Sequence, residues 1–140
     1  MKANPYHYFD DIVCINLQSR PDKRALAQRT FENCHIPARF FTAQKHALGG
    51  RIGCFDSHIR VISEAYMNGK KNIIVFEDDV KPSPSYSLKD VANLVDFLQT
   101  RNGVDILYLG FFPMRQSTLS LFQFLAAESV SEHLQRMLTV

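Results

Sequence analysis

Three consecutive carboxylates, Glu77, Asp78 and Asp79, end an apolar run in the segment NIIVFEDDV. Like charges this close repel one another unless a positive partner is present. A divalent cation relieves the repulsion, and carboxylates are hard ligands of the kind that Mg²⁺ and Mn²⁺ take together with phosphate oxygens and water. In a strand end, neighbouring side chains alternate in direction. We therefore predict that Glu77 and Asp79 share a metal ion and that Asp78 bonds a ribose or braces the loop. A solvated turn is the alternative.

A second motif, INLQSRPDKR at residues 15–24, joins a strand end to a helix that starts at Pro21. Backbone N–H groups and the helix dipole attract an anion at such a start. Arg20, Lys23 and Arg24 add positive charge beside it. The motif indicates a phosphate or diphosphate pocket, and the alternative is that these cations only form the solvated face of a helix.

The third motif, GGRIGCFDSH at residues 49–58, contains glycines that permit tight turns and close approach of a ligand. We expect Asp56 and Ser57 to cap the following helix, and His58 to contact a phosphate or a substrate hydroxyl unless its role is structural. The pattern is neither a dinucleotide fingerprint nor a Walker loop. A catalytic pair of Cys54 and His58, four residues apart, is set aside because no third group that would orient it is evident in the sequence.

The elements that must position these motifs alternate between strands and helices. Apolar runs predict strands at 11–17, 38–44, 72–79 and 104–112. Apolar residues at helical spacing predict one helix that starts at Pro21, a second that ends before Gly69 and a third over 86–103. The tail 113–140 is also helix-like. This order is typical of an α/β fold with a mainly parallel sheet. Ligands bind at the carboxyl ends of strands in such sheets, which is where residues 77–79 lie.

The composition indicates an ordinary globular protein. With 140 residues and 46% hydrophobic content we expect a single domain over 1–140. The net charge of +2 does not favour nucleic-acid binding. An odd count of three cysteines suits a reduced, cytoplasmic protein, and no run approaches the roughly 20 apolar residues of a membrane span. Peripheral membrane association and homo-oligomerisation are left open.

Taken together, VCINLQSRPDKR, GRIGCFDSHIRVISEAY and IIVFEDDV, with a weaker DILYLG block, resemble glycosyltransferase family 25 over residues 10–112. This family includes bacterial lipooligosaccharide galactosyltransferases and animal collagen galactosyltransferases. The resemblance implies a GT-A type fold, a Rossmann-like three-layer sandwich. It also implies inverting transfer of a sugar, commonly galactose from UDP-galactose, to a saccharide acceptor such as lipooligosaccharide, usually with Mn²⁺ and otherwise with Mg²⁺.

The resemblance also assigns site residues. Glu77, Asp78 and Asp79 would form the acidic motif, with Asp79 foremost as a direct metal ligand. The remaining six would lie near the nucleotide or shape the donor pocket: Asn16, Arg20, Arg24, Gly53, Ser57 and His58. No catalytic base is assigned, because the family continues with an acceptor-binding half to which residues 113–140 show no counterpart.

Two other functions are weighed against this one. The chain could be a truncated, inactive relic that serves as a donor-binding or dimerisation module through its apolar C-terminal segment. A receiver-type phosphoryl-transfer domain is disfavoured, because its acidic pair would follow the first strand, where INLQSR stands. The sequence does not decide the sugar, the acceptor or the linkage, nor whether the chain is active alone.

Overall fold

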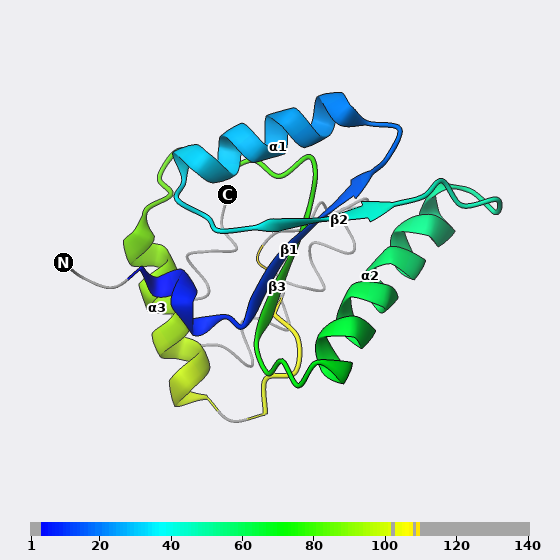
Figure 1. Ribbon diagram of the computed structural model, residues 1–140. Coiled ribbons are helices and arrows are strands. Elements are labelled where there is room, and N and C mark those ends of the chain that lie inside the picture. The colour runs from blue at the N-terminus through cyan, green and yellow to red at the C-terminus, as the bar shows by residue number, and fades with distance from the viewer. Residues whose placement is uncertain (1–3, 102, 108, 110–140) are drawn as a thin grey trace, which may run out of the picture. The chain divides into compact units, whose positions relative to one another are not determined.

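The computed structural model describes residues 4–101, 103–107 and 109, and it shows an α/β fold (Figure 1). In chain order the elements are a 3₁₀ helix η1 (Pro5–Tyr8), β1 (Asp11–Leu17), α1 (Pro21–Asn33), β2 (Arg39–Ala43), α2 (Gly50–Met67), β3 (Ile73–Glu77) and α3 (Leu88–Thr100). All of them belong to the first of two units, residues 1–102, and the second unit comprises residues 103–140. No helix in the described residues is long and apolar enough to cross a membrane. The single domain and the cytoplasmic location stay predictions.

The three described strands form a parallel sheet in the order β2-β1-β3, which confirms the predicted fold class. The central strand β1 pairs Leu17 with Ala43 of β2 and Ile15 with Glu77 of β3. The carboxyl ends of the strands therefore meet at one edge. The chain passes from β1 through α1 to β2 at one edge of the sheet, and then through α2 to β3 at the other edge. Right-handed crossovers in these two opposite directions place α1 and α2 on opposite faces of the sheet (Figure 1).

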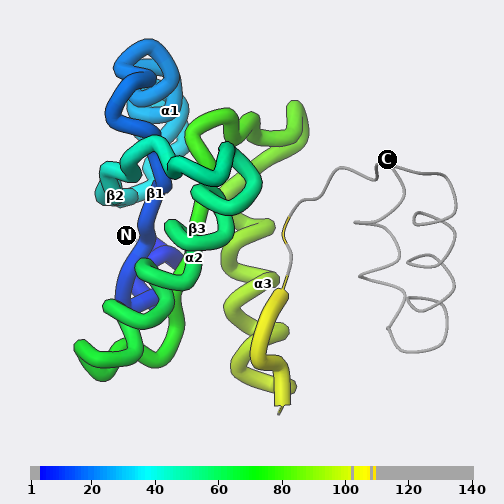
Figure 2. Tube along the Cα trace, turned by 90° about the vertical axis from the view of Figure 1, so that its right-hand side faces the viewer, coloured from blue at the N-terminus to red at the C-terminus, as the bar shows by residue number. Residues whose placement is uncertain are grey.

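One face of the sheet carries two adjoining apolar clusters. Cys14 of β1 packs with Ala27 and Phe31 of α1. Ile12 and Ile74 pack with residues from η1 and α3, namely Tyr6 and Val91. The other face is covered by α2, and Figure 2 shows α2 and α3 apart from each other in a second view. Strand β1 is thus buried on both sides, as its uninterrupted apolar run predicts.

Helix α2 begins earlier than the sequence predicts. It starts at Gly50, so Asp56 and Ser57 lie inside the helix and their predicted capping role is wrong. The turn before the helix is made by Gly49, whose φ of 98° lies in the left-handed region that favours glycine. The glycine-rich run therefore combines one turn residue with the first turn of a helix. Buried Ser57 donates its hydroxyl to the carbonyl of Gly53 at 2.7 Å.

The apolar spacing that predicts α2 does not identify its buried face. Ile59, Ile62 and Tyr66 are exposed, whereas Val61 and Ala65 are buried. The small side chain of Ala65 allows the helix to approach the sheet closely, which hydrophobic size alone does not indicate. The predicted end of the helix at Gly69 is confirmed, because this glycine has a φ of 69° and its N–H, like that of Lys70, donates to a carbonyl of the last helical turn, as in a Schellman motif.

The strand predicted over 104–112 is wrong for the residues that the structure describes. Residues 103–107 have neither helix nor strand, and the apolar side chains of Val104 and Ile106 are exposed. A strand needs a neighbouring backbone to pair with, and an apolar run does not guarantee one. The remainder of that segment, apart from residue 109, and the helical tail predicted over 113–140 lie outside the described residues.

Candidate functional site

The end of β1 is tied to the turn after β3 by a hydrogen bond between two predicted site residues. Asn16 is 2% exposed, and its Nδ2 donates to Oδ2 of Asp78 at 2.7 Å. The same nitrogen donates to the carbonyl of Arg20 at 3.1 Å. One buried amide therefore holds together the carboxyl ends of two parallel strands and the start of α1, and it fixes the orientation of the Asp78 carboxylate.

The three consecutive carboxylates do not act as one cluster. Strand β3 ends at Glu77, and Asp78 and Asp79 lie in the turn that follows, where the N–H of Val80 donates to the carbonyl of Glu77 at 3.2 Å. The alternation that would align Glu77 with Asp79 therefore stops one residue too early. Glu77 instead contacts α2, where the thiol of Cys54 donates to its Oε1 at 3.5 Å.

The acidic turn places negative charge near the buried thiol of Cys14. Burial foremost, together with the charges of Asp78, Asp79 and Glu77 and against the opposing charge of Arg24, raises the pKa of Cys14 to about 12. This thiol remains neutral at physiological pH. The strand ends thus present a negative field, which favours a cation.

At the start of α1, a carboxylate of the chain itself occupies the predicted anion position. Arg20 makes two hydrogen bonds to Asp22, at 2.9 and 2.8 Å. The Arg20 guanidinium foremost, and then the backbone N–H groups of Lys23 and Asp22, lower the pKa of Asp22 to about 2. An incoming phosphate would share these donors with Asp22. An acidic residue in a first helical turn is the signal that could have indicated this arrangement.

Arg24 lies on the β2 side of α1. Its guanidinium carbon is 4.3 Å from the centre of the Phe40 ring, a cation–π contact. Its Nη1 also donates to Oγ1 of Thr42 at 3.4 Å. The structure therefore gives Arg24 partners on β2, and a role at the nucleotide stays a prediction.

The predicted residues of α2 differ in their surroundings. A Cβ at Gly53 would lie 2.9 Å from the Cβ of His46, so the absence of a side chain lets the preceding loop pack on the helix. Ser57 is turned to the helix backbone by its bond to Gly53. Only His58 of these three lies beside the acidic segment, because it forms a close group with Cys54 and Glu77.

This group corrects the reason for which the Cys54 and His58 pair was set aside. The ligand atoms of Cys54, His58 and Glu77 all lie within 4.8 Å of one another, so a third group is present. The sequence shows the four-residue spacing, but it does not show that β3 brings Glu77 to this face of α2. Burial and the charge of Glu77 raise the pKa of Cys54, which keeps the thiol protonated and disfavours nucleophilic catalysis.

Comparison with known proteins adds an independent observation. The chain is 28% identical over 130 residues to a probable inactive glycosyltransferase 25 family member 3 of Rattus norvegicus, covering 73% of this chain and 23% of that protein. It is 25% identical over 126 residues to a glycosyltransferase 25 family member of Aedes aegypti (71% and 21%), and 27% identical over 130 residues to procollagen galactosyltransferase 1 of Danio rerio (73% and 21%). The chain is therefore similar in sequence to proteins of glycosyltransferase family 25.

The family resemblance seen in the sequence motifs is thereby confirmed. The chain spans only about a fifth of the length of these curated relatives, with coverage of 21 to 23%. No family model matches the chain, and no solved structure matches it. Of the three relatives, one is named as inactive, so homology to glycosyltransferase 25 family proteins does not by itself establish turnover.

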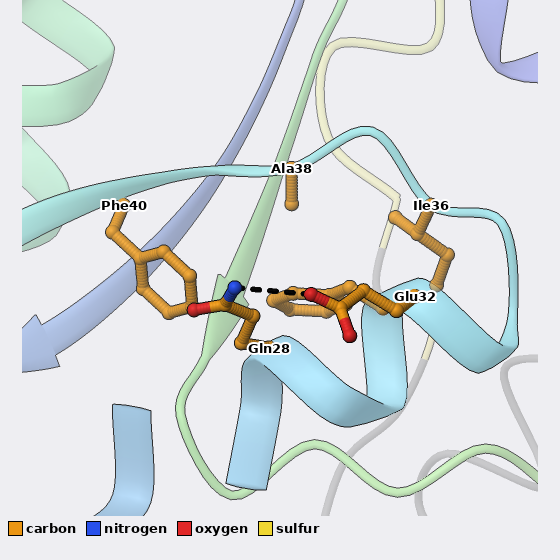
Figure 3. A pocket seen from close by; sticks show the side chains of 6 residues that line it. Gln28, Glu32, Ile36, Ala38 and Phe40 are labelled. Carbon is orange, nitrogen blue, oxygen red and sulfur yellow. Dashed lines mark hydrogen bonds between the residues drawn. The ribbon is translucent and has the colours of Figure 1, made fainter. Parts of the chain in front are cut away.

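A separate hollow of about 260 Å³ lies between α1 and β2 (Figure 3). On its rim Gln28 donates to Glu32 at 3.0 Å. No predicted site residue lines it; its lining residues are Gln28, Phe31, Glu32, Ile36, Ala38 and Phe40. The hollow therefore does not coincide with the strand ends that the motifs indicate.

Proposed function

We propose that this chain binds the nucleotide-diphosphate sugar of a glycosyltransferase at the carboxyl ends of β1 and β3. The hydrogen bond between Asn16 and Asp78 carries the proposal, because it organises polar groups at the edge where α/β sheets take ligands. Homology to glycosyltransferase 25 family proteins supports a sugar nucleotide as that ligand. The proposed enzyme class is a hexosyltransferase.

The carboxylates after β3 suit a hard divalent cation in their chemistry, although the turn that begins after Glu77 does not hold Glu77 and Asp79 side by side. Glu77 and Asp79 offer exposed carboxylate oxygens, and Mg²⁺ or Mn²⁺ typically takes one or two such ligands with the rest from phosphates and water. We propose these two residues as ligands of Mn²⁺, or of Mg²⁺ in its place. Such an ion would neutralise charge that develops on the leaving diphosphate.

The chain's own residues would position the donor. Asn16 donates a hydrogen bond to one carboxylate oxygen of Asp78. The other oxygen is left to accept a hydrogen bond from a ribose hydroxyl. Arg20 is proposed to reach a phosphate while it keeps its contact with Asp22. Further donor contacts are proposed for Arg24, Gly53, Ser57 and His58.

The reaction proposed by homology is inverting transfer of galactose from UDP-galactose to a saccharide acceptor, such as lipooligosaccharide. An acceptor hydroxyl, deprotonated by a general base, would attack the anomeric carbon on the face opposite the diphosphate. We assign this base to no described residue.

Titration calorimetry with UDP, in the presence and absence of Mn²⁺, tests the proposal. We expect binding that depends on Mn²⁺ and that weakens at least about tenfold in Asp79→Ala, a loss of about 1.4 kcal/mol. The matched control is Asp96→Ala, which removes an exposed carboxylate from α3 and should leave binding unchanged. No binding of UDP in either condition would exclude donor binding, and binding unaffected by Asp79→Ala would exclude the metal role.

A second candidate is an inactive donor-binding or dimerisation module. Two curated relatives carry the word inactive in their names. Helix α2 also presents exposed apolar side chains at helical spacing: Ile52, Phe55, Ile59, Ile62 and Tyr66. Size-exclusion chromatography with light scattering, combined with an assay of UDP-galactose hydrolysis, separates the candidates. A dimer without hydrolysis supports the module, whereas a monomer that hydrolyses the donor argues against it.

A further inference from the structure

Helix α2 and strand β3 bring a thiol, an imidazole and a carboxylate to one point on the surface. The Sγ atom of Cys54 lies 3.8 Å from Nδ1 of His58 and 3.5 Å from Oε1 of Glu77. Cys54 and Glu77 are exposed and His58 is partly buried, so solvent reaches the group. Two of the three side chains come from successive turns of one helix, and the third from the end of the strand beneath it.

These separations match those in a tetrahedral zinc site. Zinc lies about 2.3 Å from a cysteine sulfur and about 2.0–2.2 Å from a histidine nitrogen or a carboxylate oxygen, so two ligands at the tetrahedral angle are about 3.5 Å apart. The observed distances of 3.5 and 3.8 Å from sulfur are close to that value, and all three ligand atoms lie within 4.8 Å of one another. A hydrogen bond between two of these side chains would not by itself account for the third beside them.

We propose that Cys54, His58 and Glu77 form a three-ligand site for a thiophilic divalent cation such as Zn²⁺. A thiolate and an imidazole favour zinc over the hard cations that oxygen ligands select. When the metal ion binds, the thiol proton of Cys54 passes to solvent. Nδ1 of His58, which lies 3.0 Å from the carbonyl oxygen of Cys54 in the free protein, gives up that contact. The fourth position stays open to water, as in zinc sites with three protein ligands.

Occupancy of this site regulates the donor site, because Glu77 belongs to both. A zinc-bound Glu77 is turned to Cys54 and is no longer available to the donor's cation, so Zn²⁺ weakens Mn²⁺-dependent donor binding. This regulatory step rests on the proposed function, whereas the zinc site itself does not.

Titration of the 140-residue chain with Co²⁺, followed by displacement with Zn²⁺ in the presence of a chromophoric chelator, tests the site directly. Cobalt bound to a thiolate gives a sulfur-to-metal charge-transfer band, which reports Cys54. We expect one ion per chain, loss of the band in Cys54→Ser, and at least about 10–100-fold weaker binding in His58→Ala and Glu77→Gln, since even outer-shell changes have this effect.

The matched control is Cys34→Ser, since Cys34 is the other cysteine that is not fully buried, and it should leave the band unchanged. Circular dichroism on each variant checks folding, and Cys54→Ser is at an exposed position that should not disturb it. A band that survives Cys54→Ser, or a wild-type chain that binds no Co²⁺, overturns the site.

Calorimetry with UDP then tests the coupling. Zn²⁺ should weaken Mn²⁺-dependent UDP binding to the wild-type chain and should have no such effect on Cys54→Ser, which still binds UDP. Equal inhibition of both proteins overturns the regulatory step. A chain that binds Co²⁺ through Cys54 but never binds UDP refutes the proposed function and leaves the zinc site standing.

Discussion

Replacing Asn16 by alanine should destabilise the fold and loosen the strand ends at which donor binding is proposed. The side chain is buried, and its Nδ2 donates both to a carbonyl at the start of α1 and to a carboxylate in the turn after β3. Alanine leaves the Asp78 carboxylate and the Arg20 carbonyl without this donor. Asp78 is partly buried, so water replaces the donor to its carboxylate incompletely.

The expected magnitude follows from the two partners. A hydrogen bond to a charged group contributes about 1.5–3 kcal/mol, and a neutral one about 0.5–1.5 kcal/mol. We therefore expect Asn16→Ala to lower the free energy of unfolding by about 2–4.5 kcal/mol. A double-mutant cycle with Asp78→Ala should give a coupling energy of about 1.5–3 kcal/mol, because these two side chains contact each other directly.

Urea unfolding followed by circular dichroism measures these free energies for the wild type, both single variants and the double variant. Asn33→Ala is the matched control, because Asn33 is exposed at the end of α1 and its loss should change stability by less than about 0.5 kcal/mol. A coupling energy below about 0.5 kcal/mol would show that the bond between Asn16 and Asp78 does not hold the strand ends together.

Two further predictions follow from the surroundings of the candidate site. Gly53→Ala should lower the free energy of unfolding by about 1–3 kcal/mol, because the new Cβ would lie 2.9 Å from the Cβ of His46. In the control Gly50→Ala the new Cβ meets nothing within 4 Å, so the free energy of unfolding should be unchanged or rise by up to about 1 kcal/mol. Equal effects of the two variants on the urea midpoint would contradict the close approach. Arg20→Ala should raise the pKa of Asp22 from about 2 toward its ordinary 3.8, as measured by NMR titration of the carboxyl carbon. Because the folded pKa of Asp22 is depressed, its contribution to stability is complete above about pH 4 and is lost as the pH falls toward 2; an unchanged pKa in Arg20→Ala would show that this pair is not formed in solution.

The order of elements in this fold could be predicted from the sequence because each element carries a local signal. Strands β1 and β3 are short β-branched runs, and α1 begins at Pro21, a residue suited to a first helical position. The signals that failed were those whose meaning depends on tertiary contacts. The exposed fraction of Tyr66, 83%, compared with 4% for Ala65, depends on how closely α2 approaches the sheet. Local spacing contains no such information.

The candidate site was predictable in composition but not in pairing. The sequence motifs put Asn16 and Asp78 at the ends of two predicted strands, and the carboxyl ends of parallel strands meet at one edge. The sequence does not show that one amide hydrogen bonds both Asp78 and the backbone of Arg20. Nor does it show that the Arg20 guanidinium donates to Asp22. An arginine and an aspartate side by side at a helix start are equally compatible with binding of an external anion and with an ion pair between the two residues.

The division of the acidic segment follows from the end of β3 at Glu77 and leads to the most specific expectation about function. Glu77, the last strand residue, meets α2 and its thiol, while Asp78 in the turn that follows meets Asn16 at the end of β1. Neutralising these two carboxylates should therefore have separable effects. Asp78→Asn should alter stability and donor binding without affecting Co²⁺ binding, whereas Glu77→Gln should weaken both metal responses and leave the link to Asn16 intact. If both variants affected stability and both metals equally, the segment would behave as one acidic cluster, and the arrangement of two faces would have no functional consequence.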